Sequence, residues 1–210
     1  MDRIPFPEMK YPLVAILRGL KPEETPAALD ALLNAGFRAI EIPLNSPEPF
    51  KSIEIAAKMA PADALIGAGT VLTIADVDRL ESAGGRLFVS PNVDLPVLSH
   101  AVSRKMVTLP GVFTPSEALA AAGAGATGLK FFPAGVLGPA GITAIRAVLP
   151  ADLLIAAVGG VSDENFAEYA KAGVKAFGLG SSIYKPGMDA ADISRRAIAT
   201  INAYRHVFGA

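Results

Sequence analysis

Three ionisable residues lie inside short apolar segments of the sequence, where charged side chains are uncommon. Lys130 stands within the segment GLKFFP, Glu41 within AIEIPL, and Arg18 near the end of LVAILRG. A buried ammonium or carboxylate is costly unless it is paired or exchanges its proton. Burial therefore favours a neutral amine at Lys130, and a neutral amine can attack a ketone. A carboxylate beside that amine, such as Glu41, can carry protons between reaction steps.

Short β-branched segments alternate with longer segments of helical pattern along the sequence. Thr114, Pro115 and Glu117 form the capping pattern at the start of one expected helix, and Thr73 is the expected N-cap of another. We expect strands at 13–19, 39–44, 65–72, 86–91, 106–111, 128–133, 154–160 and 176–183. We expect helices at 22–36, 48–60, 73–84, 94–105, 114–125, 139–150, 162–173 and 189–207.

This regular alternation of strands and helices indicates parallel βαβ units. Eight such units in 210 residues favour an α/β protein of the (β/α)8 TIM barrel class, at the short end of its size range. An open doubly wound sheet is the alternative, but no GxGxxG motif follows the first strand and nothing in that fold sets eight units as a limit. No internal stretch is typical of a linker, so we expect a single domain over residues 1–210.

The barrel gives the charged residues a common location, because barrel enzymes place their chemistry at the carboxyl ends of the strands. Strand side chains alternate between faces, so we expect Glu41 and Lys130 to point into the barrel while their apolar neighbours pack against the helices. A structural salt bridge that fills the barrel is the alternative interpretation, but it does not explain a position near the ligand-binding end. Lys185 is the nearest competing lysine, and its segment YKPG predicts an exposed turn.

Glycine-rich sequences end the seventh and eighth expected strands. AVGGV contains Gly159 and Gly160, and GLGSSI contains Gly180 and Ser181. Glycines let backbone N–H groups face an anion, and this pair of loops is the frequent phosphate site of barrels. Tight turns alone would explain either loop, but they explain the pair less well. A third such sequence, GAGT, ends with Thr70, whose hydroxyl could bind a carboxylate or keto oxygen.

The composition argues against several other classes of protein. The absence of cysteine excludes disulfides and thiol nucleophiles, and His100 and His206 both fall in expected helices, which argues against a histidine metal site or a Ser-His-Asp triad. A net charge of −1 does not suit nucleic-acid binding. Without a signal peptide pattern or an apolar run of about 18 residues, we expect a cytoplasmic location and no membrane contact.

The residues alone predict an enzyme that forms an imine with a phosphorylated keto compound through Lys130 and Glu41.

The segments AILRG, AIEIPLNSP, IGAGTV, SPN, LKFFPA, AVGGV and GLGSSIY follow one another along the expected strands. Together they resemble the class I aldolases that cleave 2-keto-3-deoxy-6-phospho sugar acids, and the resemblance extends over nearly the whole chain. EIPLNSP and Val158 resemble the galactonate branch of that family. The gluconate branch typically has an arginine-bearing TLR sequence after the glutamate, and threonine where Val158 stands. In this comparison Arg18, together with Asn45, takes the place of the missing arginine.

The resemblance implies reversible cleavage of 2-dehydro-3-deoxy-6-phospho-D-galactonate to pyruvate and D-glyceraldehyde 3-phosphate, in galactonate and galactose catabolism. Lys130 would form a Schiff base with the C2 ketone, and Glu41, with a bound water, would shuttle protons. The resemblance also implies a homotrimer that needs no metal or organic cofactor. The implied substrate contacts are Arg18 and Thr70 at the carboxylate, Gly159, Gly160, Gly180 and Ser181 at the phosphate, Pro91 and Phe132 as apolar walls, and Val158 as a further substrate-binding residue.

Three other functions remain alternatives. The gluconate epimer differs from the galactonate form only at C4, and one side-chain contact can decide between such substrates. A phosphosugar isomerase or epimerase would share the phosphate loops, but it needs two acid/base groups or a metal, and Glu41 is the one carboxylate in the expected strands. A non-catalytic sensor of a sugar-acid phosphate would bind its ligand without using Lys130 as a nucleophile.

Overall fold

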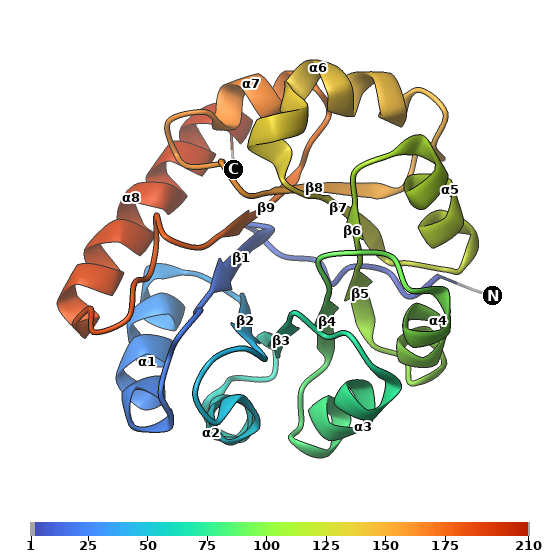
Figure 1. Cartoon of the computed structure of the whole chain (residues 1–210). Coiled ribbons are helices and arrows are strands. Elements are labelled where there is room, and N and C mark those ends of the chain that lie inside the picture. Colours follow the sequence, from blue (N-terminus) through green and yellow to red (C-terminus); the bar gives the residue numbers. More distant parts are fainter. Residues whose placement is uncertain (1–2, 210) are drawn as a thin grey trace.

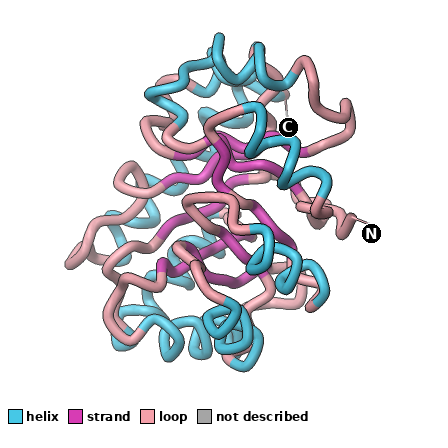
Figure 2. The backbone as a smooth tube through the Cα atoms, turned by 45° about the vertical axis from the view of Figure 1, so that its right-hand side comes forward, coloured by secondary structure: helices cyan, strands magenta, loops and turns pink. Residues whose placement is uncertain are grey.

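The computed structural model describes residues 3–209, and residues 1, 2 and 210 of the expected domain lie outside the described part. Parallel strands surround a common axis and helices form an outer ring around them (Figure 1). Figure 2 shows the same arrangement from another side, with the strands enclosed by helices and loops. The predicted (β/α)8 barrel is therefore confirmed.

The strands and helices follow one another in the predicted order. The strands are β1 (Leu13–Ile16), β2 (Ala39–Pro43), β3 (Leu65–Gly69), β4 (Leu87–Val89), β5 (Val107–Leu109), β6 (Gly111–Val112), β7 (Gly128–Phe131), β8 (Leu154–Val158) and β9 (Ala176–Leu179). The helices are the 3-10 helix η1 (Pro22–Glu24) and the α-helices α1 (Thr25–Ala35), α2 (Pro49–Met59), α3 (Ile74–Ser82), α4 (Leu95–Ser103), α5 (Pro115–Gly123), α6 (Ala134–Arg146), α7 (Phe166–Lys171) and α8 (Ala190–Phe208).

The ring closes through one chain segment that the sequence predicts as a single strand, 106–111. Pro110 divides this segment into β5 and β6, because proline has no N–H to donate to a strand ladder. β5 pairs with β4, and β6 pairs with β7. The sheet order therefore begins with β5 and ends with β6, and the two halves of one segment join its edges.

Two threonines bridge the gap that this division leaves between β5 and the start of β7. The backbone N–H of Thr108 donates to the Thr127 hydroxyl at 3.0 Å, and the N–H of Thr127 donates to the Thr108 hydroxyl at the same distance. Both residues are buried. These reciprocal side-chain bonds satisfy backbone groups that would otherwise lack a strand partner.

Alternating strand residues form two apolar layers, as predicted. Leu129 and Phe131 belong to the large core between the strands and the helices. The opposite faces of the strands meet inside the barrel, where Ile4, Phe6 and Met9 pack against them. The interior layer consists of Val14, Ala39, Leu65, Leu87, Val89, Val107 and Leu109. Next to it, towards the carboxyl ends of the strands, lie the two predicted charged residues.

The helix boundaries depend on capping residues. Thr73 and Thr114 each accept a hydrogen bond from the backbone three residues later, and Glu117 completes the predicted capping box. The start of α6 was predicted five residues too late. The helix begins at Ala134 and bends at Gly138, whose φ of 72° interrupts the helical backbone before Pro139.

We predict that Thr108→Val destabilises the protein by about 1–3 kcal/mol, because it leaves the buried N–H of Thr127 without a partner. Thr108→Ser keeps the hydroxyl and should recover part of this loss. Urea unfolding measures both effects. The matched control is Thr143→Val, which removes an exposed hydroxyl that bonds only to Pro139 of its own helix. Equal losses for Thr108→Val and Thr143→Val would contradict a role of the threonine pair in closing the barrel.

Candidate active site

Glu41 and Lys130 are the only charged side chains that are buried within residues 3–209, with 3% and 6% of their surface exposed. Glu41 lies on β2 opposite Gly67 of β3, and Lys130 lies on β7 opposite Ala156 of β8. Ala156 in turn pairs with Ala176 of β9. These small neighbours leave room inside the barrel for one long amine and one carboxylate.

Gly69 fixes the place of the Glu41 carboxylate. A Cβ atom added at Gly69 would lie 2.2 Å from Glu41 Oε2 and 2.5 Å from Oε1. Any side chain at this position would therefore displace the carboxylate. The glycine in the GAGT sequence at the end of β3 thus has a structural reason that the sequence alone does not reveal.

Burial shifts the pKa of both groups towards their neutral forms. Burial raises the pKa of Glu41 from 4.5 to about 7, while Lys130, Arg18 and the backbone N–H of Gly69 oppose the shift. Burial lowers the pKa of Lys130 from 10.5 to about 8; Glu41 opposes this change and Arg18 adds to it. Burial therefore brings the neutral amine and the protonated carboxyl within reach near neutral pH.

The two groups do not form a closed salt bridge. No ion pair joins Glu41 to Lys130 within the part of the chain that the structure describes, and Glu41 Oε2 has no hydrogen-bond partner in the protein. The Lys130 ammonium lies instead over the Phe132 ring, 4.7 Å from its centroid. A buried acceptor without a partner is uncommon in a purely structural role, so this geometry argues against the salt-bridge interpretation.

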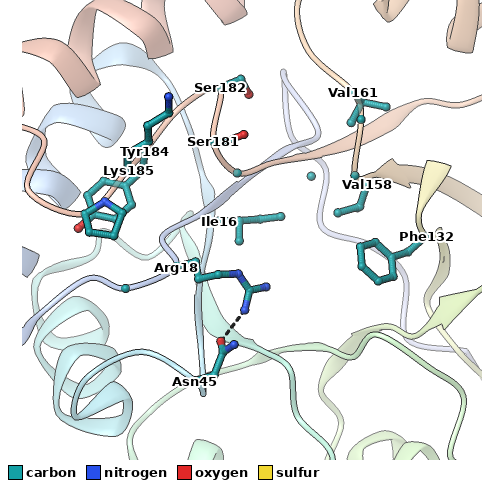
Figure 3. A pocket seen from close by; sticks show the side chains of 16 residues that line it. Ile16, Arg18, Asn45, Phe132, Val158, Val161, Ser181, Ser182, Tyr184 and Lys185 are labelled. Carbon is teal, nitrogen blue, oxygen red and sulfur yellow. Dashed lines mark hydrogen bonds between the residues drawn. The ribbon is translucent and has the colours of Figure 1, made fainter. Parts of the chain in front are cut away.

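A cavity of about 490 Å³ opens beside Phe132 at the carboxyl ends of β1, β8 and β9. Figure 3 shows Phe132 and Val158 on one side of it and Ser181, Ser182, Tyr184 and Lys185 on the other. Seven of the predicted site residues line this cavity: Arg18, Phe132, Val158, Gly159, Gly160, Gly180 and Ser181. The structure thus brings together the two glycine loops, the ring beside Lys130 and Arg18, which lies in the loop after β1 and not within the strand as predicted.

Glu41 and Lys130 are not themselves among the residues that line the cavity, and neither are Thr70 and Pro91. Thr70 and Pro91 follow β3 and β4, on another part of the barrel rim. Thr70 adopts a φ of 58°, and such a left-handed backbone costs a β-branched residue about 1–3 kcal/mol. The Pro91 carbonyl packs against Gly111, where a Cβ atom would approach it to 2.4 Å.

Asn45 and Lys185 also line the cavity, although neither is in the predicted set of substrate contacts. Asn45 accepts a hydrogen bond from Arg18, and the adjacent Ser46 accepts one at 2.9 Å from the Gly19 backbone, so the loops after β1 and β2 are tied together. Lys185 is exposed, as predicted for a turn, but it also lines the cavity. Its place directly after the GLGSSI loop was the signal that could have identified it.

Across residues 3–209 no three His, Cys, Asp or Glu side chains gather in a way that could hold a metal ion. None of the described helices is long and apolar enough to cross a membrane.

Comparison with known proteins identifies the family to which this barrel belongs. The family model for KDPG and KHG aldolase matches residues 8–199. A probable 2-dehydro-3-deoxy-6-phosphogalactonate aldolase of Rhizobium meliloti (strain 1021) is 69% identical over 209 residues, which cover 100% of this chain and 99% of the relative. The fold and site are those of a barrel lyase that acts on carbon–carbon bonds. The chain belongs to the KDPG and KHG aldolase family.

Two solved structures extend the comparison. A native KDPGal structure superposes with a TM-score of 0.94 at 44% identity, over 97% of this chain and 98% of the other. A KDPG aldolase from Legionella pneumophila has a TM-score of 0.79 at 28% identity, over 94% of each chain. In that structure pyruvate was captured at low pH as a covalent carbinolamine intermediate. The aldolase resemblance of the sequence is thus confirmed.

We predict that acetylation of Lys130 by a small reagent rises with pH, is half-maximal near pH 8 and levels off above about pH 9, because the neutral amine is the reactive form. Glu41→Gln should move this profile to lower pH, since the Glu41 carboxylate raises the pKa of Lys130. Peptide mass spectrometry after trace labelling between pH 6 and pH 11 measures both profiles. A Lys130 profile that continues to rise to pH 10, as for an ordinary lysine amine, would contradict the lowered pKa.

Proposed function

We propose that this protein cleaves 2-dehydro-3-deoxy-6-phosphogalactonate reversibly into pyruvate and D-glyceraldehyde 3-phosphate, through a Schiff base on Lys130. The observation that carries the proposal is the buried Lys130–Glu41 pair, with the amine pKa lowered towards neutrality beside the cavity. The carbinolamine in the Legionella relative supports the covalent step.

The reaction begins when the neutral Lys130 amine attacks the C2 ketone. The C2–N bond forms, a carbinolamine results, and loss of water gives the protonated imine. As the C4 hydroxyl gives up its proton, the electrons of the C3–C4 bond move into this imine. D-Glyceraldehyde 3-phosphate leaves, and a pyruvate enamine remains on Lys130. Protonation at C3 and hydrolysis of the imine release pyruvate and restore the amine.

Glu41 is the proton carrier of these steps. Its pKa of about 7 lets it both accept and donate protons near neutral pH. It can take the proton of the C4 hydroxyl during cleavage and return a proton to C3 of the enamine. The carboxylate oxygen without a protein partner, Oε2, is the atom suited to this exchange.

The ends of the substrate match the polar groups around the pair. The phosphate is held by the backbone N–H groups of Gly159, Gly160 and Gly180 and by the Ser181 hydroxyl. Gly159 and Gly160 have φ values of 83° and 79°. The Arg18 and Thr70 side chains bind the carboxylate end. Phe132 and Pro91 form apolar walls beside the reacting carbons. Imine chemistry of this kind needs neither a metal nor an organic cofactor.

Two features favour the galactonate form over the gluconate form. In the segment EIPLNSP, Asn45 accepts a hydrogen bond from Arg18. Asn45 stands at the position where the gluconate branch carries its arginine. Val158 presents an apolar side chain to the cavity, where that branch usually has threonine. The name of the Rhizobium meliloti relative supports the same assignment. We place the enzyme in galactonate catabolism in the cytoplasm.

We also propose that the single domain assembles as a homotrimer. Within residues 3–209, five of the nine large apolar side chains that are exposed lie on three consecutive βα units of the barrel, and exposed apolar surface is typical of a subunit contact. They are Leu72, Ile74, Leu95, Phe113 and Leu119.

The specificity is tested by assaying both epimers. We expect kcat/KM for the galactonate form to exceed that for the gluconate form by at least about tenfold, the range that one polar contact can supply. Val158→Thr should reduce this ratio, because it offers a hydroxyl to the substrate within the same volume. A preference for the gluconate epimer in the unaltered enzyme would overturn the assignment of the branch.

The role of Glu41 is tested by hydrogen exchange at the pyruvate methyl group. We predict that Glu41→Gln still forms an imine with pyruvate but slows exchange of the methyl protons with deuterium oxide by about 100-fold or more, the usual contribution of a general base. NMR measures the exchange, and Glu54→Gln, which alters an exposed helix carboxylate, is the control. Exchange at the unaltered rate in Glu41→Gln would remove Glu41 from this role.

A further inference from the structure

The cavity lining carries two positive side chains and no negative one. Arg18 and Lys185 are its cations, and neither an aspartate nor a glutamate lines it. A 2-keto-3-deoxy-6-phospho sugar acid carries negative charge at both ends, on a carboxylate and on a phosphate dianion. The charge of the cavity therefore suits such a ligand, with one cation available for each end.

The two cations occupy different parts of the site. The Arg18 guanidinium donates to Asn45 on the β2 side of the cavity, and its charge acts on the pKa of both Glu41 and Lys130. Arg18 therefore lies towards the reacting end. Lys185 lies across the cavity with Ser181 and Ser182, on the loop that follows β9 (Figure 3). Within residues 3–209 the Lys185 ammonium forms no hydrogen bond and no ion pair.

The backbone that carries Lys185 is held firmly. The Tyr184 hydroxyl donates to Glu24 Oε2 at 3.3 Å, and the N–H groups of Ile183 and Tyr184 both donate to the Gly180 carbonyl at 2.9 Å. On the other side, the Met188 N–H donates to the Lys185 carbonyl at 3.1 Å. The loop is thus organised without a ligand, while the lysine amine itself has no partner among the described residues.

We propose that Lys185 is a further substrate-binding residue, the cation that pairs with the phosphate held by the glycine loops. It adds charge to a subsite that otherwise consists of backbone N–H groups and a serine hydroxyl. A lysine amine acts there as a mobile point charge that can follow a phosphate dianion. Lys185 thereby selects phosphorylated over unphosphorylated 2-keto-3-deoxy sugar acids, and this inference rests on the proposed function.

The test compares Lys185→Met, Lys185→Arg and the control Lys171→Met, which alters an exposed lysine on α7. We expect Lys185→Met to raise KM for the phosphorylated substrate about tenfold, the effect of a lost charge-assisted hydrogen bond. Its kcat, its activity on the unphosphorylated sugar acid and its rate of imine formation with pyruvate should stay within about twofold. Lys185→Arg should restore most of the affinity, and Lys171→Met should behave like the unaltered enzyme.

Calorimetric titration with inorganic phosphate gives a second measurement that does not depend on catalysis. Lys185→Met should weaken phosphate binding about tenfold, and added salt should affect its binding less than that of the unaltered enzyme. Equal phosphate affinity in the two proteins, or an equal loss on the unphosphorylated substrate, would overturn the role of Lys185. Failure of the proposed function would appear differently, as the absence of a pyruvate imine in the unaltered enzyme.

Discussion

The rest of this structure depends on one constraint. An amine and a carboxylate are buried together inside the barrel without direct contact. Water no longer solvates either charge, so both pKa values move towards neutrality. A closed ion pair would undo this effect, because it would hold the lysine protonated. The barrel keeps the two groups on separate strands, β2 and β7, and places Lys130 over an aromatic ring instead.

The residues around the Glu41–Lys130 pair are small, because the two long side chains need space inside the barrel. Gly67 and Ala156 are the ladder partners of Glu41 and Lys130, and Gly69 leaves the volume that the carboxylate occupies. The opposite end of the interior is filled by apolar side chains, including Phe6 and Met9 from the segment before β1. At the carboxyl ends of the strands, Phe132 lines the cavity and lies beneath the Lys130 amine, so the cavity approaches the pair from that side.

Much of this arrangement could be predicted from the sequence, because it depends on local properties. Alternation along a strand determines that Leu129 faces the helices and Lys130 the interior, and the Thr114 capping box determines where a helix begins. The division of one strand at Pro110 could also have been predicted from the sequence, since proline cannot donate a hydrogen bond to a strand ladder. Its closure by Thr108 and Thr127 was not, because it depends on contact between segments distant in the sequence.

The cavity lining was harder to predict than the buried pair. Lys185 lies in an exposed turn, as its sequence indicates, yet the turn folds against the barrel mouth. That position depends on contacts such as the bond between Tyr184 and Glu24, which are 160 residues apart. Thr70 and Pro91 follow β3 and β4 as predicted, but like Glu41 and Lys130 they are not among the residues that line the cavity.

The most direct test of the imine mechanism is peptide mass spectrometry after the protein is treated with pyruvate and borohydride. The mechanism predicts one stable adduct, on the peptide that carries Lys130, and its loss in a folded Lys130→Met variant. An adduct on another lysine, or none in a folded enzyme that still cleaves its substrate, would contradict the central claim that the buried Lys130 amine is the nucleophile.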